Sequence, residues 1–300
     1  MNFEELKQRS GSGELLKTLQ DTDIQKSGLK IQKRVINSLI QIGDEYGLGS
    51  LSLAHRMNEC RKGQFCGNVY CMECRLRATG ALRERFQDHI EKRFEDDKEL
   101  ARKSLRYVTV LCELTDFNLE TIKKSVEQAR KNRNAVKRHF KTKGIKLWGQ
   151  GAFEFELMDM NLLMSSKTEG SKLKQKTLAK MSGMDIPECR SLGHQVIVHF
   201  HMLVDLNGAN EEEFKSYLKK RFGNVGRQID VARIHKNQEL TEMMDKLSSY
   251  GFKNRHRYNF VFDTDGYLRG DYFDDESLGR LATIYNGVGN NGYTGLLISL

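Results

Sequence analysis

The segment HQVIVHFHMLVDL, residues 194–206, alternates in a way that an extended strand satisfies. Its even-numbered positions are apolar over five successive pleats: Val196, Val198, Phe200, Met202 and Val204. Successive strand side chains point to opposite faces, so these residues form one face that packs on a core. His199 and His201 then project together from the other face. That pair is either two surface histidines on a half-exposed strand or two ligands for one metal ion.

The chain on either side of this strand alternates between strand and helix patterns. LRYVTVLCEL (105–114) and GAFEFELM (151–158) precede it as strands, and RQIDVARI (227–234) follows as a fourth. Amphipathic helices are predicted over 118–143, 210–222 and 238–253. The order β-α-β-β-α-β plus a final helix predicts an α+β domain of the ferredoxin-like, or RRM-like, kind. Such a domain has an antiparallel sheet with helices on one face and leaves the other face open for a site.

Changes in composition divide the chain into four segments. We expect a helical N-terminal appendage over 1–50. Residues 51–104 are expected to form a zinc-binding module whose last part, 79–104, is a helix. The sheet domain with its last helix spans 105–262, and a C-terminal tail fills 263–300. A polar, lysine-rich insertion at 164–193 interrupts the domain and is expected to be a mobile basic loop beside the site.

The strand at 151–158 supplies candidates for a third metal ligand. Glu154 and Glu156 share one face of it, and either carboxylate could complete a His-His-carboxylate set with His199 and His201. We choose Glu156 over Glu154. Histidine and carboxylate ligands suit Mn²⁺ or Mg²⁺ in a phosphate-handling site and leave zinc open.

Four cysteines within fifteen residues predict a second, structural metal site. They read Cys60-x5-Cys66-x4-Cys71-x2-Cys74. In a reducing compartment such crowding favours metal over disulfides, and four thiolates make a closed tetrahedral zinc site. We therefore expect Zn²⁺ at this cluster.

A candidate nucleophile lies on the helix predicted at 238–253. Tyr250 extends its apolar stripe, which we expect to face the sheet, and Lys253 is three residues further on. A free tyrosine has a pKa near ~10 and needs cations or a metal to act as a phenolate. Taken from the helix alone, a packing tyrosine is the plainer interpretation.

The charge of the chain favours an anionic partner. Lysine and arginine number 49 against 40 acidic residues, a net charge of +9. Nucleic acid is the leading partner, and candidate contacts are Lys131, Arg133 and Lys137 on one helix and Arg75 beside the cysteines. The helix lysines and arginines are equally explained as a solvated surface. With no apolar leader and no run of ~18 apolar residues, we expect a cytoplasmic protein that does not engage a membrane.

Together these segments resemble the rolling-circle replication initiators of plasmids, in the HUH endonuclease superfamily. The cysteine cluster comes first, and YVTVL (107–111) resembles the first-motif strand, although Leu111 stands where threonine is common. HFH (199–201) resembles the metal-binding motif, and YGFK (250–253) the tyrosine-x-x-lysine motif. The resemblance spans about residues 55–262 and rests on the order of the motifs.

The resemblance implies an enzyme that nicks and rejoins single-stranded or hairpin origin DNA. The metal on His199 and His201 would polarise the scissile phosphate, and Tyr250 would form a 5′-phosphotyrosine link. A host helicase and polymerase would be further partners. Lys246 stands where some relatives carry a glutamate that ends replication, so the termination step is open. The alternatives are a non-catalytic zinc-containing nucleic-acid-binding protein, a nuclease that uses water, or a transposase of the same superfamily.

Overall fold

The computed structural model describes residues 22–43, 49–60, 65–95, 97–167, 169–234, 239–250, 252–253, 255–258, 272–290 and 292–300. They form α-helices and one five-stranded antiparallel sheet, so the fold is α+β. Chain contacts divide it into two compact units. Unit 1 comprises Met1–Lys98, Asn237–His256 and Phe273–Leu297, and unit 2 comprises Glu99–Lys236, Arg257–Tyr272 and Ile298–Leu300.

The sheet has the strand order β4-β1-β3-β2-β5. Its strands are β1 (Leu105–Asp116), β2 (Trp148–Asp159), β3 (His194–Asp205), β4 (Ile229–Arg233) and β5 (Leu297–Ser299). β3, the strand of the histidines, lies in the middle and pairs antiparallel with both β1 and β2. β4 pairs antiparallel with β1. Residues on β3 therefore have neighbours on both sides.

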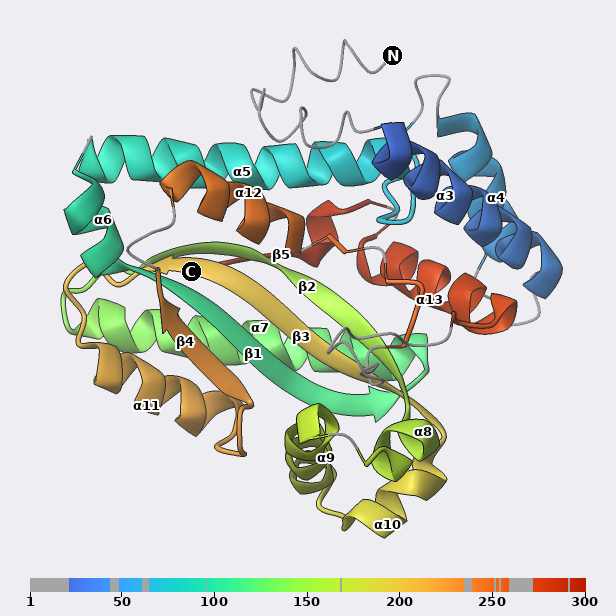
Figure 1. Ribbon diagram of the computed structural model, residues 1–300. Helices are drawn as coiled ribbons and strands as arrows, with labels where there is room; N and C mark the ends of the chain where they lie inside the picture. The colour runs from blue at the N-terminus through green and yellow to red at the C-terminus, as the bar shows by residue number, and fades with distance from the viewer. Residues whose placement is uncertain are drawn as a thin grey trace. The chain divides into compact units, whose positions relative to one another are not determined.

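Helices α7 (Leu119–Thr142) and α11 (Glu211–Phe222) run along one face of this sheet (Figure 1). The predicted apolar face of β3 packs beneath them: Phe200 and Phe222 lie edge to face, 5.6 Å between ring centroids. The amide of Glu120 donates to the Asn118 side chain, which caps α7 as its sequence predicts. His199 and His201 consequently point away from these helices.

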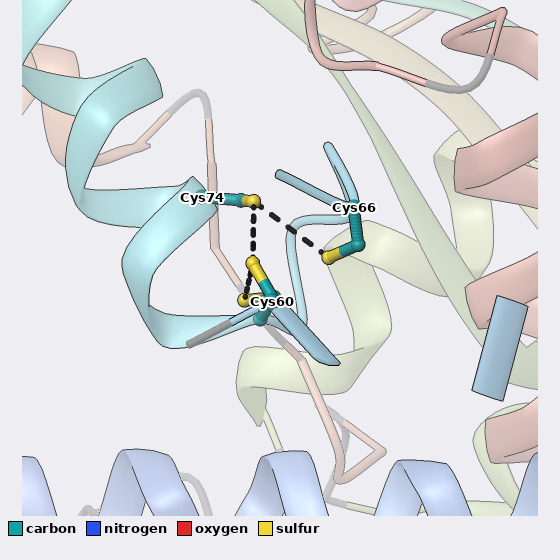
Figure 2. A group of neighbouring side chains, drawn as sticks. Cys60, Cys66 and Cys74 are labelled. Carbon is teal, nitrogen blue, oxygen red and sulfur yellow. Dashed lines mark hydrogen bonds between the residues drawn. The ribbon is translucent and has the colours of Figure 1, made fainter. Parts of the chain in front are cut away.

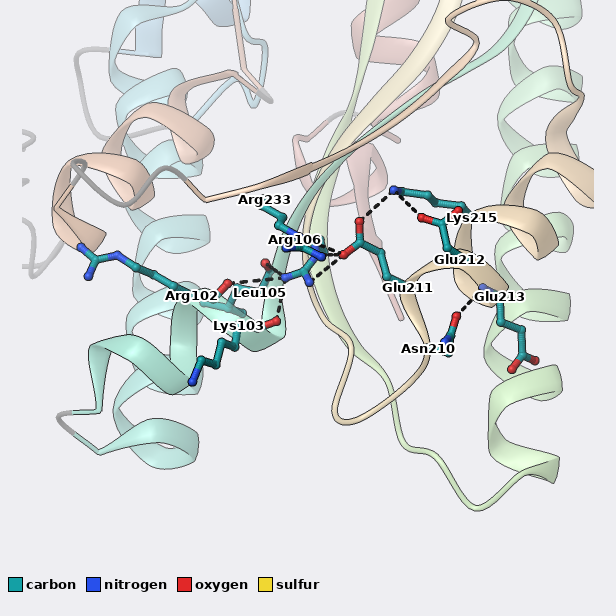
Figure 3. A network of polar contacts seen from close by, with 10 residues as sticks. All are labelled: Arg102, Lys103, Leu105, Arg106, Asn210, Glu211, Glu212, Glu213, Lys215 and Arg233. Atoms are coloured by element: carbon teal, nitrogen blue, oxygen red, sulfur yellow. Dashed lines mark hydrogen bonds and ion pairs between the residues drawn. The ribbon is translucent and has the colours of Figure 1, made fainter.

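The Glu211 carboxylate of α11 binds Arg106 of β1 and Arg233 of β4 at one end of the sheet (Figure 3). Arg106 is 5% exposed, and its Nε and Nη2 lie 2.9 and 2.8 Å from the Glu211 carboxylate. Its Nη1 donates to the carbonyls of Lys103 and Leu105. Lys215 and Arg233 also contact Glu211, so three cations surround one carboxylate.

The insertion between β2 and β3 is helical. It forms α8 (Met160–Ser165), α9 (Glu169–Ser182), α10 (Ile186–Cys189) and a 3-10 turn at Arg190–Leu192. The expected mobile loop at 164–193 is therefore wrong over its described part. Local capping accounts for the difference: Asp159 accepts from the Leu162 amide at the start of α8, and Asp185 and Glu188 form a capping box on α10.

Unit 1 is built from helices. α3 (Thr22–Ile42), α4 (Ser50–Glu59) and α13 (Asp275–Val288) pack together, and Arg34 pairs with Asp275 across α3 and α13. α12 (Leu240–Tyr250) lies against α5 (Met72–Phe94), where the Arg83 guanidinium binds the Asp245 carboxylate. Within unit 1, the apolar stripe of α12 has α5 as its described neighbour.

The single helix expected at 79–104 is two helices. α5 begins earlier, at Met72, and ends at Phe94; α6 (Lys98–Ser104) follows. Glu95 separates them with φ at 49°, a positive value that a helix cannot continue through. A further helix, α13, occupies part of the segment expected to be a tail.

Candidate metal centres

The four cysteines of unit 1 converge as the spacing predicts. Their sulfur atoms all lie within 4.8 Å of one another, and Figure 2 shows three of them pointing toward a common centre. Cys60 Sγ is 3.5 Å from Cys74 Sγ and 3.4 Å from Cys71 Sγ, and Cys66 Sγ is 3.6 Å from Cys74 Sγ. Zn–S bonds of about 2.3 Å in a tetrahedron put sulfurs about 3.8 Å apart. The cluster has the size for one metal ion.

The end of α4, the start of α5 and the connection between these helices hold this cluster. Cys60 follows α4, Cys66 and Cys71 lie in the connection, and Cys74 is in the first turn of α5. All four thiols are buried. Hydrogen bonds from the other three thiols, that of Cys66 above all, hold the pKa of Cys60 far below its usual range. Hydrogen bonding to Cys60 raises the pKa of Cys66, Cys71 and Cys74, and binding of a cation would release the protons of these thiols.

A second group forms on the sheet in unit 2. Donor atoms of Glu154, His199 and His201 also lie within 4.8 Å of one another. Nε2 of His201 is 3.2 Å, and Nε2 of His199 is 3.8 Å, from the same carboxylate oxygen of Glu154. Ligand bonds of about 2.1 Å place neighbouring donors about 3–3.5 Å apart. The three residues could therefore hold one ion between them.

Strand register decides which glutamate joins the histidines. Glu154 lies directly opposite His199, whereas Glu156 lies opposite Ile197, one pleat further along. The Glu156 carboxylate instead contacts Lys174 Nζ of α9 at 2.9 Å. The preference for Glu156 is thus corrected in favour of Glu154, because pairing between strands, which one strand's pattern does not contain, sets the choice.

Two residues of β1 orient His201. Tyr107 Oη lies 2.7 Å and Thr109 Oγ1 lies 3.0 Å from its Nδ1, and the Tyr107 ring stacks on the imidazole at an interplanar angle of 3°. With Nδ1 engaged, Nε2 faces Glu154. Histidine ligands of metals are held in this way by a partner on the second ring nitrogen. Tyr107 and Thr109 were not predicted to orient His201. Their i, i+2 spacing places them on one face of β1, but the pairing of Thr109 with His201 is visible only in the structure.

Comparison of the chain with protein families, with curated proteins and with solved structures finds no match. Every helix that the structure describes is too short or too polar to cross a bilayer.

Tyr250 and Lys253 lie together at the end of α12, in unit 1. The Lys253 ammonium is 3.4 Å from the centre of the Tyr250 ring, so the predicted spacing does bring the two side chains together. Tyr250 is half-buried, whereas the stripe residues Leu240, Met243, Met244 and Leu247 are buried. Its phenol is therefore less enclosed than a core tyrosine.

The predicted DNA contacts fall into two kinds. Lys131 and Lys137 are exposed on α7. The Arg133 guanidinium donates to the backbone carbonyl of Ser299, and burial lowers its pKa. Arg75 is half-buried beside the cysteines, and burial lowers its pKa as well. Of the four, the two lysines present their charge on the surface.

Proposed function

We propose that this protein is a metal-dependent endonuclease that nicks and rejoins single-stranded DNA, with the activity of the rolling-circle initiators that its sequence resembles. The observation that carries the proposal is the convergence of Glu154, His199 and His201 on the sheet. The strand order β4-β1-β3-β2 supports a ferredoxin-like core, in which the histidine strand is central.

The residues fit a divalent cation at the sheet and zinc at the cysteines. Glu154, His199 and His201 would hold Mn²⁺ or Mg²⁺, which supplies a Lewis acid for a phosphoryl oxygen. Tyr107 and Thr109 keep His201 in the orientation that this ligand set needs. Four thiolates leave no open position, so the zinc at Cys60, Cys66, Cys71 and Cys74 is structural.

The chain's own chemistry centres on Tyr250. Its phenol oxygen attacks the scissile phosphorus and forms a 5′-phosphotyrosine ester, while the 3′ oxygen of the preceding nucleotide leaves and takes up a proton. Lys253, whose ammonium lies beside the ring, binds the phosphate under attack. One phosphate ester replaces another, so no bond energy is lost, and the same residues reseal the strand when the 3′-hydroxyl returns.

The charge of the chain supports a DNA substrate. A net charge of +9 and the exposed lysines Lys131 and Lys137 attract a phosphate backbone. The strand must be single or melted at the nick, as in the loop of an origin hairpin, for its phosphate to reach half-buried groups. A host helicase and polymerase would then extend the freed 3′ end.

The test is a covalent adduct. Full-length protein and Mn²⁺ are incubated with a pool of random single-stranded oligonucleotides labelled at the 3′ end, and a denaturing gel is read for label that migrates with protein. Wild type and the control Tyr217→Phe, on α11, should form the adduct, and Tyr250→Phe and Glu154→Gln should not. An adduct in Tyr250→Phe places the nucleophile elsewhere. Cleavage without adduct means that water attacks, and binding without cleavage leaves a non-catalytic DNA-binding protein.

A further inference from the structure

We propose that Lys174, on the helical insertion, enforces the choice of carboxylate that strand register favours at the metal group. By holding Glu156, it leaves Glu154 as the only carboxylate on this face of β2 offered to the cation. The inference rests on the metal group of the proposed function, but not on the nicking reaction.

The backbone places two carboxylates on the face of β2 that carries the site. Glu154 and Glu156 project from the same face of β2, about 6.7 Å apart along the strand. Both are buried, at 0% and 8% exposure, so neither is an ordinary surface acid. Glu154 reaches His199 and His201, and Glu156 is one pleat away. A cation near the histidines would attract both.

Lys174 removes this ambiguity. Its Nζ lies 2.9 Å from a Glu156 oxygen, with 28% and 10% of the two side chains exposed. At this degree of burial the ion pair is screened less than one on the surface. The Glu156 charge is balanced by the ammonium of Lys174, which is part of the chain and, unlike a bound ion, does not exchange with solvent. The insertion, which the strands do not require, thereby contributes a residue to the site.

The charge balance explains what the pair achieves. With Glu156 neutralised, a divalent cation on one carboxylate and two imidazoles leaves a net charge of +1, which attracts a phosphate. Without Lys174, the second carboxylate would cancel that charge and repel the phosphate. Lys174 is thus a positioning residue, which acts through Glu156.

Equilibrium Mn²⁺ binding to the full chain, followed by electron paramagnetic resonance of the free ion, tests this directly. Lys174→Gln unmasks a negative charge about 7 Å from the cation and should tighten Mn²⁺ binding about tenfold. Glu156→Gln leaves an unbalanced lysine and should weaken it by a similar factor. The double variant restores neutrality and should return to the wild-type value, as should the control Lys174→Arg.

A second pair of variants tests ligand choice. Glu154→Gln should abolish tight Mn²⁺ binding, and Glu154→Gln combined with Lys174→Gln should regain at least about tenfold of it, because Glu156 is then available. The inference is overturned if the two single variants bind Mn²⁺ like wild type, or if the rescue fails. Should Lys174→Gln not fold, Glu156→Gln still decides. Absence of Mn²⁺ binding in wild type would instead defeat the metal group itself.

Discussion

Replacing Glu211 with glutamine should destabilise unit 2 by an amount that depends on pH. Glu211 is the carboxylate shared by Arg106, Arg233 and Lys215. Hydrogen bonding from Lys215, with the charges of Arg106 and Lys215, lowers its pKa from 4.5 to about 2. The buried Arg106 would keep its carbonyl partners in the variant but lose its counter-charge.

The magnitude follows from that shift. A difference of about 2.5 in pKa corresponds to about 3.4 kcal/mol without screening. Arg233 is 74% exposed, and solvent weakens the cluster on that side, so we expect a loss of about 2 kcal/mol at pH 7. A lowered pKa in the folded state gives stability that is present above 4.5 and is lost as the pH falls toward about 2. The difference in unfolding free energy between wild type and Glu211→Gln should therefore be constant from pH 7 to 5 and shrink below 4.5.

Urea unfolding at each pH measures the effect. Trp148, the only tryptophan of the chain, lies at the start of β2, so its fluorescence reports the unfolding of unit 2. The matched control is Glu212→Gln on the same helix turn, where the side chain is 81% exposed and a loss below about 0.5 kcal/mol is expected. A difference in unfolding free energy that persists unchanged at pH 2, or an equal loss in both variants, would contradict a charge effect at Glu211.

The two metal groups give further predictions. Cys74→Ser, or treatment with a strong chelator, should remove one zinc per chain and reduce the helical circular dichroism, because the cluster ties α4 to α5; unchanged metal content would contradict a zinc site built from the four thiolates. Tyr107→Phe should keep the ring stack but lose the hydroxyl at His201 Nδ1, and should weaken Mn²⁺ binding at least about tenfold by titration. Binding equal to wild type would show that Thr109 alone suffices to orient the ring.

The sequence predicted best what is local to one element. The alternation of β3 is a property of consecutive residues, so the faces of Phe200 and His201 followed from it and the core packing agrees. The cysteine spacing likewise needs only one loop and one helix turn. In both cases a short segment contains the whole geometric constraint.

Features that depend on contacts between several elements were not predictable from the pattern of a single element. The choice of Glu154 depends on the register between β2 and β3 and on Lys174, which lies in the insertion beyond β2. The break after α5 lies at a single residue with positive φ, Glu95, in a polar stretch without glycine. α13 was missed because acidic and glycine-rich flanks obscured its apolar residues, although Asp274 caps it by an ordinary side-chain hydrogen bond.

The central position of β3 affects how firmly Glu154, His199 and His201 would hold a cation. Edge strands exchange their amide protons through small fluctuations, but an inner strand opens only when both of its neighbours separate. Two of the three ligands are on that inner strand and the third is on its hydrogen-bonded neighbour. Fraying at β4 or β5 leaves the three donors in register. A cation bound by Glu154, His199 and His201 would therefore be held by the part of the sheet that opens least often.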